Sequence, residues 1–197
     1  MGVPPLTNTL KNILTMENFH ELLLNRRSIR RYTSEPVDSD QVRLILEAAL
    51  TCPTSKSGRS WHFIVVEDKE MLRQLGECKP NYALSVANAP LAVVVCADMT
   101  KSDAWIEDAS VAAIVMQLQA ADFGLGSCWV EVRDRYREDG TPSEEYVREL
   151  LGIPENYGVV AIVSIGHKDE ERKPINPEKL QWEKVSIGRF KSPEPAE

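Results

Sequence analysis

The groups in this chain best suited to bind an anion are four arginines and two small hydroxyl side chains within eight residues. They are Arg26, Arg27, Ser28, Arg30, Arg31 and Thr33. Guanidinium groups offer paired donors that match phosphate oxygens, and a serine hydroxyl or a free backbone N–H can complete such a site. This arginine cluster, residues 26–33, therefore predicts a phosphate site. The alternative is a solvated turn after a helix, where the helix dipole also favours arginine.

The rest of the composition favours a small-molecule partner. The chain has 197 residues, a formal net charge of −7 and a pI near 5.1. A general nucleic-acid-binding protein usually carries a basic face far larger than one arginine cluster, so we expect no nucleic-acid partner. Hydrophobic residues make up 43% and charged residues 27%, which is ordinary for a globular protein, and the length predicts a single domain over residues 1–197.

Metal, disulfide and membrane chemistry have little support in the sequence. The four cysteines, at positions 52, 78, 96 and 128, lack CxxC spacing, and the three histidines show neither an HExxH motif nor paired spacing. We therefore expect no metal site. No stretch approaches the roughly 20 apolar residues of a membrane span, and the N-terminus lacks an apolar signal region. These features predict a cytoplasmic protein without a membrane partner.

Two helices are predicted on either side of the arginine cluster. The first covers residues 17–25 and follows a predicted N-terminal arm, residues 1–16. The second begins after Asp38, a residue type that caps helix N-termini, with Gln41 placed for a capping box. Pro53 stops this helix because proline lacks the N–H that a helix interior needs. The cluster is therefore expected in a connection between two helices.

Strands alternate with helices in the rest of the chain. Alternating or β-branched apolar runs predict strands at residues 61–66, 91–97, 127–130 and 159–166. A short helix is predicted over residues 68–77. Residues 141–144, Thr-Pro-Ser-Glu, predict a capping box with proline at the first position of a helix that closes at Gly152. This alternation indicates an α/β or α+β protein.

The longest predicted helix covers residues 103–123. Between positions 109 and 121 only Ser110, Gln117 and Gln119 are polar. A helix that is apolar on nearly every side is expected to run through the core, with at most a thin wetted stripe. The sequence Gly-Leu-Gly at residues 124–126 ends it.

The last segment, residues 167–197, is rich in lysine, glutamate and proline and carries widely spaced apolar side chains. These are Leu180, Trp182, Val185, Ile187 and Phe190. Such a segment has too few apolar residues to form a core of its own. It is predicted to be an extended C-terminal arm whose apolar side chains pack on another surface, such as that of a second subunit.

Four short motifs follow one another along the chain. They are the Arg-x-Ser-x-Arg of the cluster with Pro36-Val37 after it, residues 52–57 leading to Trp61-His62-Phe63, residues 124–129, and Gly166 at the end of a strand. Each motif alone is weak, but four in register are a strong signal. In this order they resemble the FMN-dependent nitroreductase family over about residues 17–190. The resemblance implies an α+β (α/β sandwich), nitroreductase-like fold: a mostly antiparallel central sheet flanked by helices, a core helix, and a C-terminal arm exchanged in a dimer.

The resemblance also implies an FMN site. In this family the arginine motif holds the flavin phosphate, the loop before the Trp strand contacts the flavin ring, and the glycine stretch and the strand after it lie against the flavin. A basic residue after the last strand also reaches the phosphate. The cofactor-binding residues implied here are Arg26, Arg27, Ser28, Arg30, Ser55, Lys56, Ser57, Arg59, Gly126, Ser127, Cys128, Trp129 and Lys173.

Several of these residues have plain structural alternatives. Arg172 is an alternative to Lys173 as the late basic contact, and either can simply be a solvated charge. Cys128 and Trp129 lie on a predicted strand and can belong to the core, so neither is given a catalytic role.

The loop before Trp61 departs from the family pattern Pro-Ser-x-x-Asn-x-Gln-Pro-Trp, because Ser57, Arg59 and Ser60 replace its Asn, Gln and second Pro. Amide side chains both donate and accept hydrogen bonds, whereas Lys56 and Arg59 only donate. Cations at this place would favour the negatively charged reduced flavin and raise its potential. The alternative is that they are exposed loop cations that face water.

The activity implied by the resemblance is an FMN-dependent oxidoreductase. NADH or NADPH would give hydride to flavin N5, and a nitroaromatic, a quinone or a similar electron-poor acceptor would then be reduced in the same pocket, in a ping-pong reaction that needs no catalytic side chain. The implied assembly is a homodimer with two FMN sites, each built from both chains. The alternatives are reductive dehalogenation or flavin fragmentation on the same scaffold, a noncatalytic flavin-binding or storage protein, and an anion-binding module without flavin.

Overall fold

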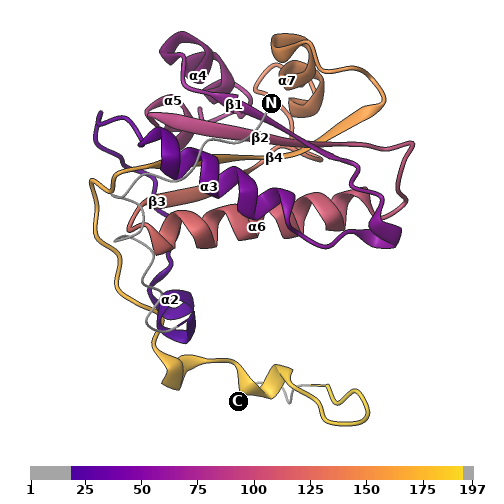
Figure 1. Ribbon diagram of the computed structural model, residues 1–197. Helices are drawn as coiled ribbons and strands as arrows, with labels where there is room; N and C mark the ends of the chain where they lie inside the picture. Colours follow the sequence, from indigo (N-terminus) through magenta and orange to yellow (C-terminus); the bar gives the residue numbers. More distant parts are fainter. Residues whose placement is uncertain (1–18, 193–197) are drawn as a thin grey trace.

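Four strands form one antiparallel sheet in the order β1-β2-β4-β3 (Figure 1). They are β1 (Trp61–Val66), β2 (Leu91–Asp98), β3 (Gly126–Glu131) and β4 (Tyr157–Gly166). The computed structural model describes residues 19–192. The two central strands, β2 and β4, are buried on both faces, which explains why they are continuous apolar runs in the sequence. The four predicted strands are confirmed, with ends shifted by at most two residues.

Helices cover both faces of the sheet, so the molecule has three layers (Figure 1). One face carries α3 (Ser39–Leu50) and α6 (Trp105–Asp122); the other carries α4 (Lys69–Gly76), α5 (Leu84–Ala87) and α7 (Ser143–Leu151). Alternate residues of β2 divide between the two cores: Val93 and Val95 pack on the α3/α6 side, and Val94 and Cys96 on the α4/α7 side. The fold is therefore of the α+β class, as predicted.

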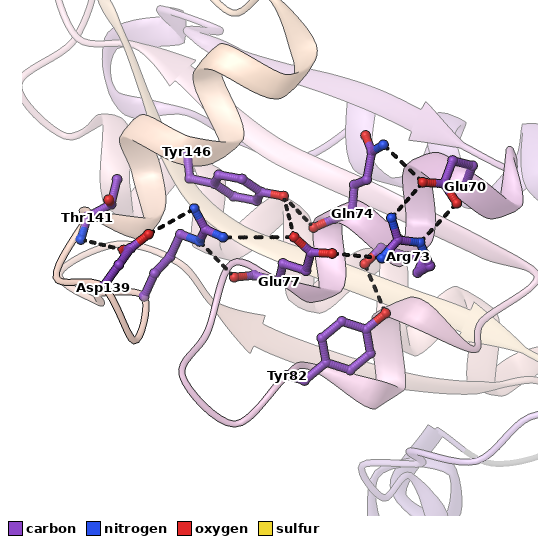
Figure 2. Close-up of polar contacts among 9 residues, drawn as sticks. Glu70, Arg73, Gln74, Glu77, Tyr82, Asp139, Thr141 and Tyr146 are labelled. Carbon is purple, nitrogen blue, oxygen red and sulfur yellow. Dashed lines mark hydrogen bonds and ion pairs between the residues drawn. The ribbon is translucent and has the colours of Figure 1, made fainter.

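The polar groups on the α4/α7 side hold these helices together (Figure 2). Arg73 pairs with Glu70 and Glu77 within α4. Arg137 bonds the carbonyl of Glu77 and lies 4.0 Å from the ring centroid of Tyr146, whose hydroxyl donates to the carbonyl of Gln74. The guanidinium groups of Arg73 and Arg137 are both paired with carboxylates, so neither is a free cation for a ligand.

The N-terminal cap of α3 is confirmed, whereas the predicted capping box of α7 is wrong. The Asp38 carboxylate accepts from the backbone N–H groups of Asp40 and Gln41. At α7, Pro142 is the N-cap residue rather than the first helical residue, and it has no side-chain cap. Glu144 accepts instead from the N–H of Val159 on β4, at 3.1 Å. The Glu144 carboxylate, which the sequence motif assigned to the helix cap, therefore bonds a residue of the sheet instead.

The longest helix, α6, is not enclosed as predicted. Its side against the sheet is made of small residues with Met116 among them, and α3 packs beside it. A third side is uncovered, and there Val111 and Ile114 are 38% and 39% exposed. The sequence showed no amphipathic pattern because this uncovered side is apolar as well. An apolar strip on the outside of a helix is a surface suited to a partner.

The chain after β4 leaves the three-layered body as an extended arm (Figure 1). Up to residue 192, where the described part ends, it contains only the short helices η2 (Pro177–Lys179) and η3 (Trp182–Lys184). Its apolar side chains are exposed, with Trp182 at 69% and Phe190 at 87%. The predicted arm over residues 1–16 and the first two residues of the predicted helix 17–25 lie outside the described residues; the rest of that helix is α2 (Phe19–Asn25). No described helix is long and apolar enough to span a bilayer.

Candidate functional site

The arginine cluster lies along the start of β3. The backbone N–H of Ile29 donates to the carbonyl of Ser127 at 2.9 Å, and Ser28 and Ser127 form a parallel bridge. A few residues later, the N–H of Thr33 donates to the carbonyl of His167, just after β4. The backbone of the cluster is therefore held by hydrogen bonds to the ends of two strands, while the side chains of Arg30 and Arg31 are exposed.

Gly126 lets the cluster approach the sheet this closely. A Cβ on Gly126 would lie 2.7 Å from Cγ2 of Ile29, which is closer than side-chain atoms normally approach. Ile29 itself is only 3% exposed. The glycine predicted to face the flavin thus has a packing role, because any side chain there would push the cluster away from β3.

Tyr32 fastens the other end of the cluster to β4. Its hydroxyl donates to the carbonyl of Ile29 at 2.6 Å and lies 2.9 Å from Oγ of Ser164. Burial raises the pKa of Tyr32 well above its usual value, so the hydroxyl keeps its proton and remains a donor. These hydrogen bonds fix the backbone of residues 29–32, which carries Arg30 and Arg31.

A cavity of about 770 Å³ opens beside the cluster and is bounded by the beginning of the C-terminal arm. Its lining includes Arg26, Arg27, Ser127, Lys168, Glu170 and Arg172. The guanidinium of Arg27 donates to the carbonyl of Lys173. Arg26 has no ion-pair partner among the described residues. The predicted late contact Lys173 reaches the site through its carbonyl, whereas its alternative Arg172 lines the cavity.

An acidic side chain already occupies part of this cationic site. The Glu170 carboxylate accepts from the backbone N–H of Arg30 at 2.6 Å and from the guanidinium of Arg172 at 2.8 Å. The N–H of Arg30, with help from Arg172 and Arg31, holds the pKa of Glu170 below its usual value. These donors therefore stabilise an anion, which is the chemistry that a phosphate group needs.

The other predicted contacts lie in the loop of residues 54–60, which precedes β1 and contains η1 (Ser55–Ser57). Lys56, Ser57 and Arg59 all have left-handed backbone conformations, with φ of 51°, 55° and 46°. The N–H of Ser55 donates to the carboxylate of Asp108, at 2.8 Å. Lys56 lies 3.8 Å from the Asp103 carboxylate, and both side chains are well exposed. The backbone of this loop is strained, and Asp108 of α6 holds it in place.

The two groups of predicted contacts do not meet within one chain. The 54–60 loop is attached to Asp108 in the first turns of α6, whereas the cavity beside the arginine cluster is lined by Ala121 in its last turn. Thirteen residues of α-helix separate these positions, a distance of about 20 Å at 1.5 Å per residue. A ligand that touches both groups of one chain would have to span about this distance.

Cys128 and Trp129 point to opposite faces of β3. Cys128 is 2% exposed in the core of the α4/α7 side, and burial raises the pKa of its thiol. Trp129 packs toward α6, and its indole N–H donates to the Glu131 carboxylate at 2.9 Å. The thiol is therefore an unreactive core group, and the carbonyl of Cys128 faces β4, where it accepts from Oγ of Ser164 at 3.4 Å.

Comparison with known proteins identifies the family of this chain. The model of the nitroreductase family matches residues 23–115 and 79–167, which together cover most of the chain. The chain belongs to the nitroreductase family. A solved FMN-dependent nitroreductase of Clostridium difficile R20291 shares 46% sequence identity, covering 87% of this chain and 99% of its own, with a TM-score of 0.85.

Two curated relatives carry names of the same kind. A protein of Archaeoglobus fulgidus with the provisional name NADH dehydrogenase/NAD(P)H nitroreductase is 36% identical, over 86% of this chain and 99% of its own. An FMN reductase [NAD(P)H] of Bacillus subtilis is 28% identical, over 79% of this chain and 69% of its own. The family and fold predicted from the sequence are confirmed, and these names agree with the predicted enzyme class, an oxidoreductase that uses FMN with NADH or NADPH.

The residues of this family member fit an FMN phosphate. The cavity offers an Arg26 guanidinium with no ion-pair partner in the described part of the chain, and backbone and guanidinium donors that already hold one carboxylate. Metal ligation has no comparable support, since residues 19–192 contain no group of three or more His, Cys, Asp or Glu side chains that could hold an ion.

Sequence reasoning missed two residues that shape the site. Glu170 lies in a charged run without periodicity, so nothing distinguished it from its neighbours Asp169 and Glu171. Asp108 belongs to none of the four motifs, although its side chain holds the 54–60 loop. A buried acid in the first turns of an otherwise apolar helix is the one signal that could have drawn attention to Asp108.

Proposed function

We propose that this chain is an FMN-dependent oxidoreductase that takes electrons from NADH or NADPH and reduces a small electron-poor acceptor such as a nitroaromatic or a quinone. The observation that supports this most directly is the cavity beside the arginine cluster, where the Arg30 N–H and the Arg172 guanidinium already hold one carboxylate. When bound, FMN supplies the hydride and electron transfer itself, so the protein needs only to bind, orient and polarise.

The arginine cluster binds the phosphate in this proposal. Arg26, Arg27 and Arg30 provide the positive charge, and Ser28 adds a hydroxyl. Arg172 is better placed than Lys173 to add a further cation, since its side chain lines the cavity. Backbone groups of Gly126, Ser127, Cys128 and Trp129, at the start of β3, lie along the flavin.

A homodimer completes the site. The 54–60 loop of a second copy, with Ser55, Lys56, Ser57 and Arg59, would reach the ring end of a flavin whose phosphate is held by the first. Two features support this arrangement: the loop and the cluster lie at opposite ends of α6, and the helix between them exposes Val111 and Ile114. The C-terminal arm, with Trp182 and Phe190 exposed, would wrap around the other copy.

We place the enzyme in the cytoplasm as a single domain over residues 1–197. Support for the location comes from the cysteines, which are all free and buried, as is usual in a reducing compartment. Support for one domain comes from the sheet, because the two cores on its opposite faces share the strands β2 and β4.

The test is an anaerobic absorbance spectrum of the purified protein with FMN, recorded before and after NADH or NADPH is added. We expect a bound yellow chromophore that is bleached by the nicotinamide and restored by 1,4-benzoquinone. Riboflavin provides the control, since Arg26→Ala is expected to weaken the binding of FMN about tenfold or more, as for the loss of a charge-assisted hydrogen bond, and to leave riboflavin unaffected. A protein that binds no flavin would refute the proposal; one that binds FMN but is not reduced would be a storage protein.

A further inference from the structure

The 54–60 loop has an unusual density of backbone strain. Three of its residues, Lys56, Ser57 and Arg59, have positive φ, and none of them is glycine. Such conformations cost free energy and persist only where the surroundings enforce them, which is typical of positions that face a ligand. Within the loop, the N–H of Arg59 donates to Oγ1 of Thr54 and the N–H of Gly58 to the carbonyl of Ser55. These local bonds shape the turn but do not attach it to the body of the protein.

Asp108 makes that attachment. One carboxylate oxygen accepts from the N–H of Ser55 at 2.8 Å, and the other lies 3.4 Å from Oγ of Ser102, which in turn accepts from the N–H of Ala104. Asp108 is 5% exposed, so these bonds are shielded from water. One buried carboxylate thus joins α6 to two loops, one that leads from α3 into β1 and one that leads from β2 into α6.

The dipole of α6 alone does not explain this arrangement. A helix dipole favours an acid anywhere in the first turn, exposed or not, and Glu107 already meets that need from an exposed position. Asp108 instead points into the protein, toward a backbone N–H of another segment. Where the loop meets β1, the side-chain Oγ of Ser60 and Nε1 of Trp61 are buried and have no hydrogen-bond partner among the described residues. These two groups therefore leave hydrogen-bonding capacity that water or a ligand can use at this place.

We propose that Asp108 is a positioning residue for flavin binding: by holding Ser55 it keeps the 54–60 loop in the strained shape that contacts the flavin ring. The inference rests on the proposed function, in which this loop reaches the ring end of the flavin. Because Asp108 lies at the end of α6 remote from the arginine cluster, its removal should weaken ring binding and leave phosphate binding intact.

The experiment compares Asp108→Ala, Asp108→Asn and Asp68→Ala by quenching of flavin fluorescence, with FMN and riboflavin as the two probes. Asp68 is the matched control, because it caps α4 through the N–H of Met71 at 2.8 Å on the other face of the sheet. Asp108→Ala should weaken the binding of both flavins by the same factor, about tenfold, because one buried N–H is left without its acceptor. Asp108→Asn keeps an acceptor oxygen for Ser55 and should remain close to the wild type.

A second readout separates positioning from general stability. Asp108→Ala and Asp68→Ala should both lower the unfolding temperature, but only Asp108→Ala should raise the KM for 1,4-benzoquinone, and it should do so by a larger factor than it lowers kcat. The inference is overturned if Asp108→Ala folds and binds both flavins like the wild type. It is overturned as well if Asp68→Ala weakens flavin binding as much as Asp108→Ala does. It is also overturned if Asp108→Asn is as defective as Asp108→Ala. A wild-type protein that binds neither flavin would instead refute the proposed function.

Discussion

The carboxylate of Glu170 accepts a hydrogen bond from the backbone N–H of Arg30, 140 residues earlier in the chain, at 2.6 Å. With Arg172 also bonded to it and only 8% of its side chain exposed, Glu170 is a built-in anion in the site that we assign to the flavin phosphate. The site therefore holds its donors in place before any ligand arrives, but a negative charge next to a phosphate also weakens its binding.

Glu170→Gln should accordingly bind FMN more tightly than the wild type. The amide oxygen of glutamine can still accept from Arg30, so the geometry is kept while one like charge is removed. We expect the dissociation constant of FMN to fall about tenfold, as for a single partly screened charge, and that of riboflavin to stay the same. Titration of flavin fluorescence measures both.

The same variant tests the lowered pKa of Glu170. Because its pKa in the folded protein is below the usual 4.5, the ionised group stabilises the folded state above that value, and this contribution is lost as the pH falls through the lowered pKa. The difference in unfolding free energy between wild type and Glu170→Gln should be constant near neutral pH and shrink in acid. A difference that does not change with pH, or FMN binding weaker than that of the wild type, would contradict the role given to Glu170.

Gly126→Ala should displace the arginine cluster from β3. The new Cβ would overlap Ile29, and overpacking of this kind costs about 1–3 kcal/mol of unfolding free energy. Urea denaturation should show this loss, and FMN should bind more weakly because the cluster moves. Adding Ile29→Ala removes the obstructing side chain. The double variant should therefore lose less unfolding free energy than the two single variants lose in sum. Simple additivity would mean that the two residues do not compete for space.

Ile114→Glu should separate the homodimer that we propose. A carboxylate on the exposed apolar strip of α6 would have to be buried without a partner charge in the interface. Sedimentation equilibrium should then report a monomer, and FMN affinity should fall because the 54–60 loop of the second copy is missing. Leu84→Glu is the control, since Leu84 is 58% exposed on α5, on the other side of the sheet. A monomeric Ile114→Glu protein that binds FMN normally would rule out a site shared between copies.

Arg59→Met should lower the midpoint potential of bound FMN more than Lys56→Met does. Both cations would favour the negatively charged reduced flavin, but Lys56 lies near the Asp103 carboxylate, whereas Arg59 has no ion-pair partner in the described residues. Spectroelectrochemical titration should show a shift of some tens of millivolts for Arg59→Met. Unchanged potentials in both variants would mean that these side chains face water.

The sequence alone was sufficient for the family and the four strands, and it put forward residues 26–33 as the anion site that we propose. Strand periodicity, helix caps such as Asp38 and the order of the four motifs are local properties, and local patterns can be read without coordinates. The same local reasoning was wrong at Glu144, where a backbone N–H of β4 replaced the expected partner in the helix cap.

Only the tertiary structure decided what lies beside what. It brought Glu170 to Arg30, placed Ile29 against Gly126, turned Asp108 toward Ser55, and put the two groups of predicted flavin contacts at opposite ends of α6. None of these relations has a sequence signature, because each joins residues that are distant in the chain and depends on how helices and strands pack. An apolar helix can face a core or a partner with the same residues, and only the arrangement of its neighbours shows which side of α6 is left uncovered.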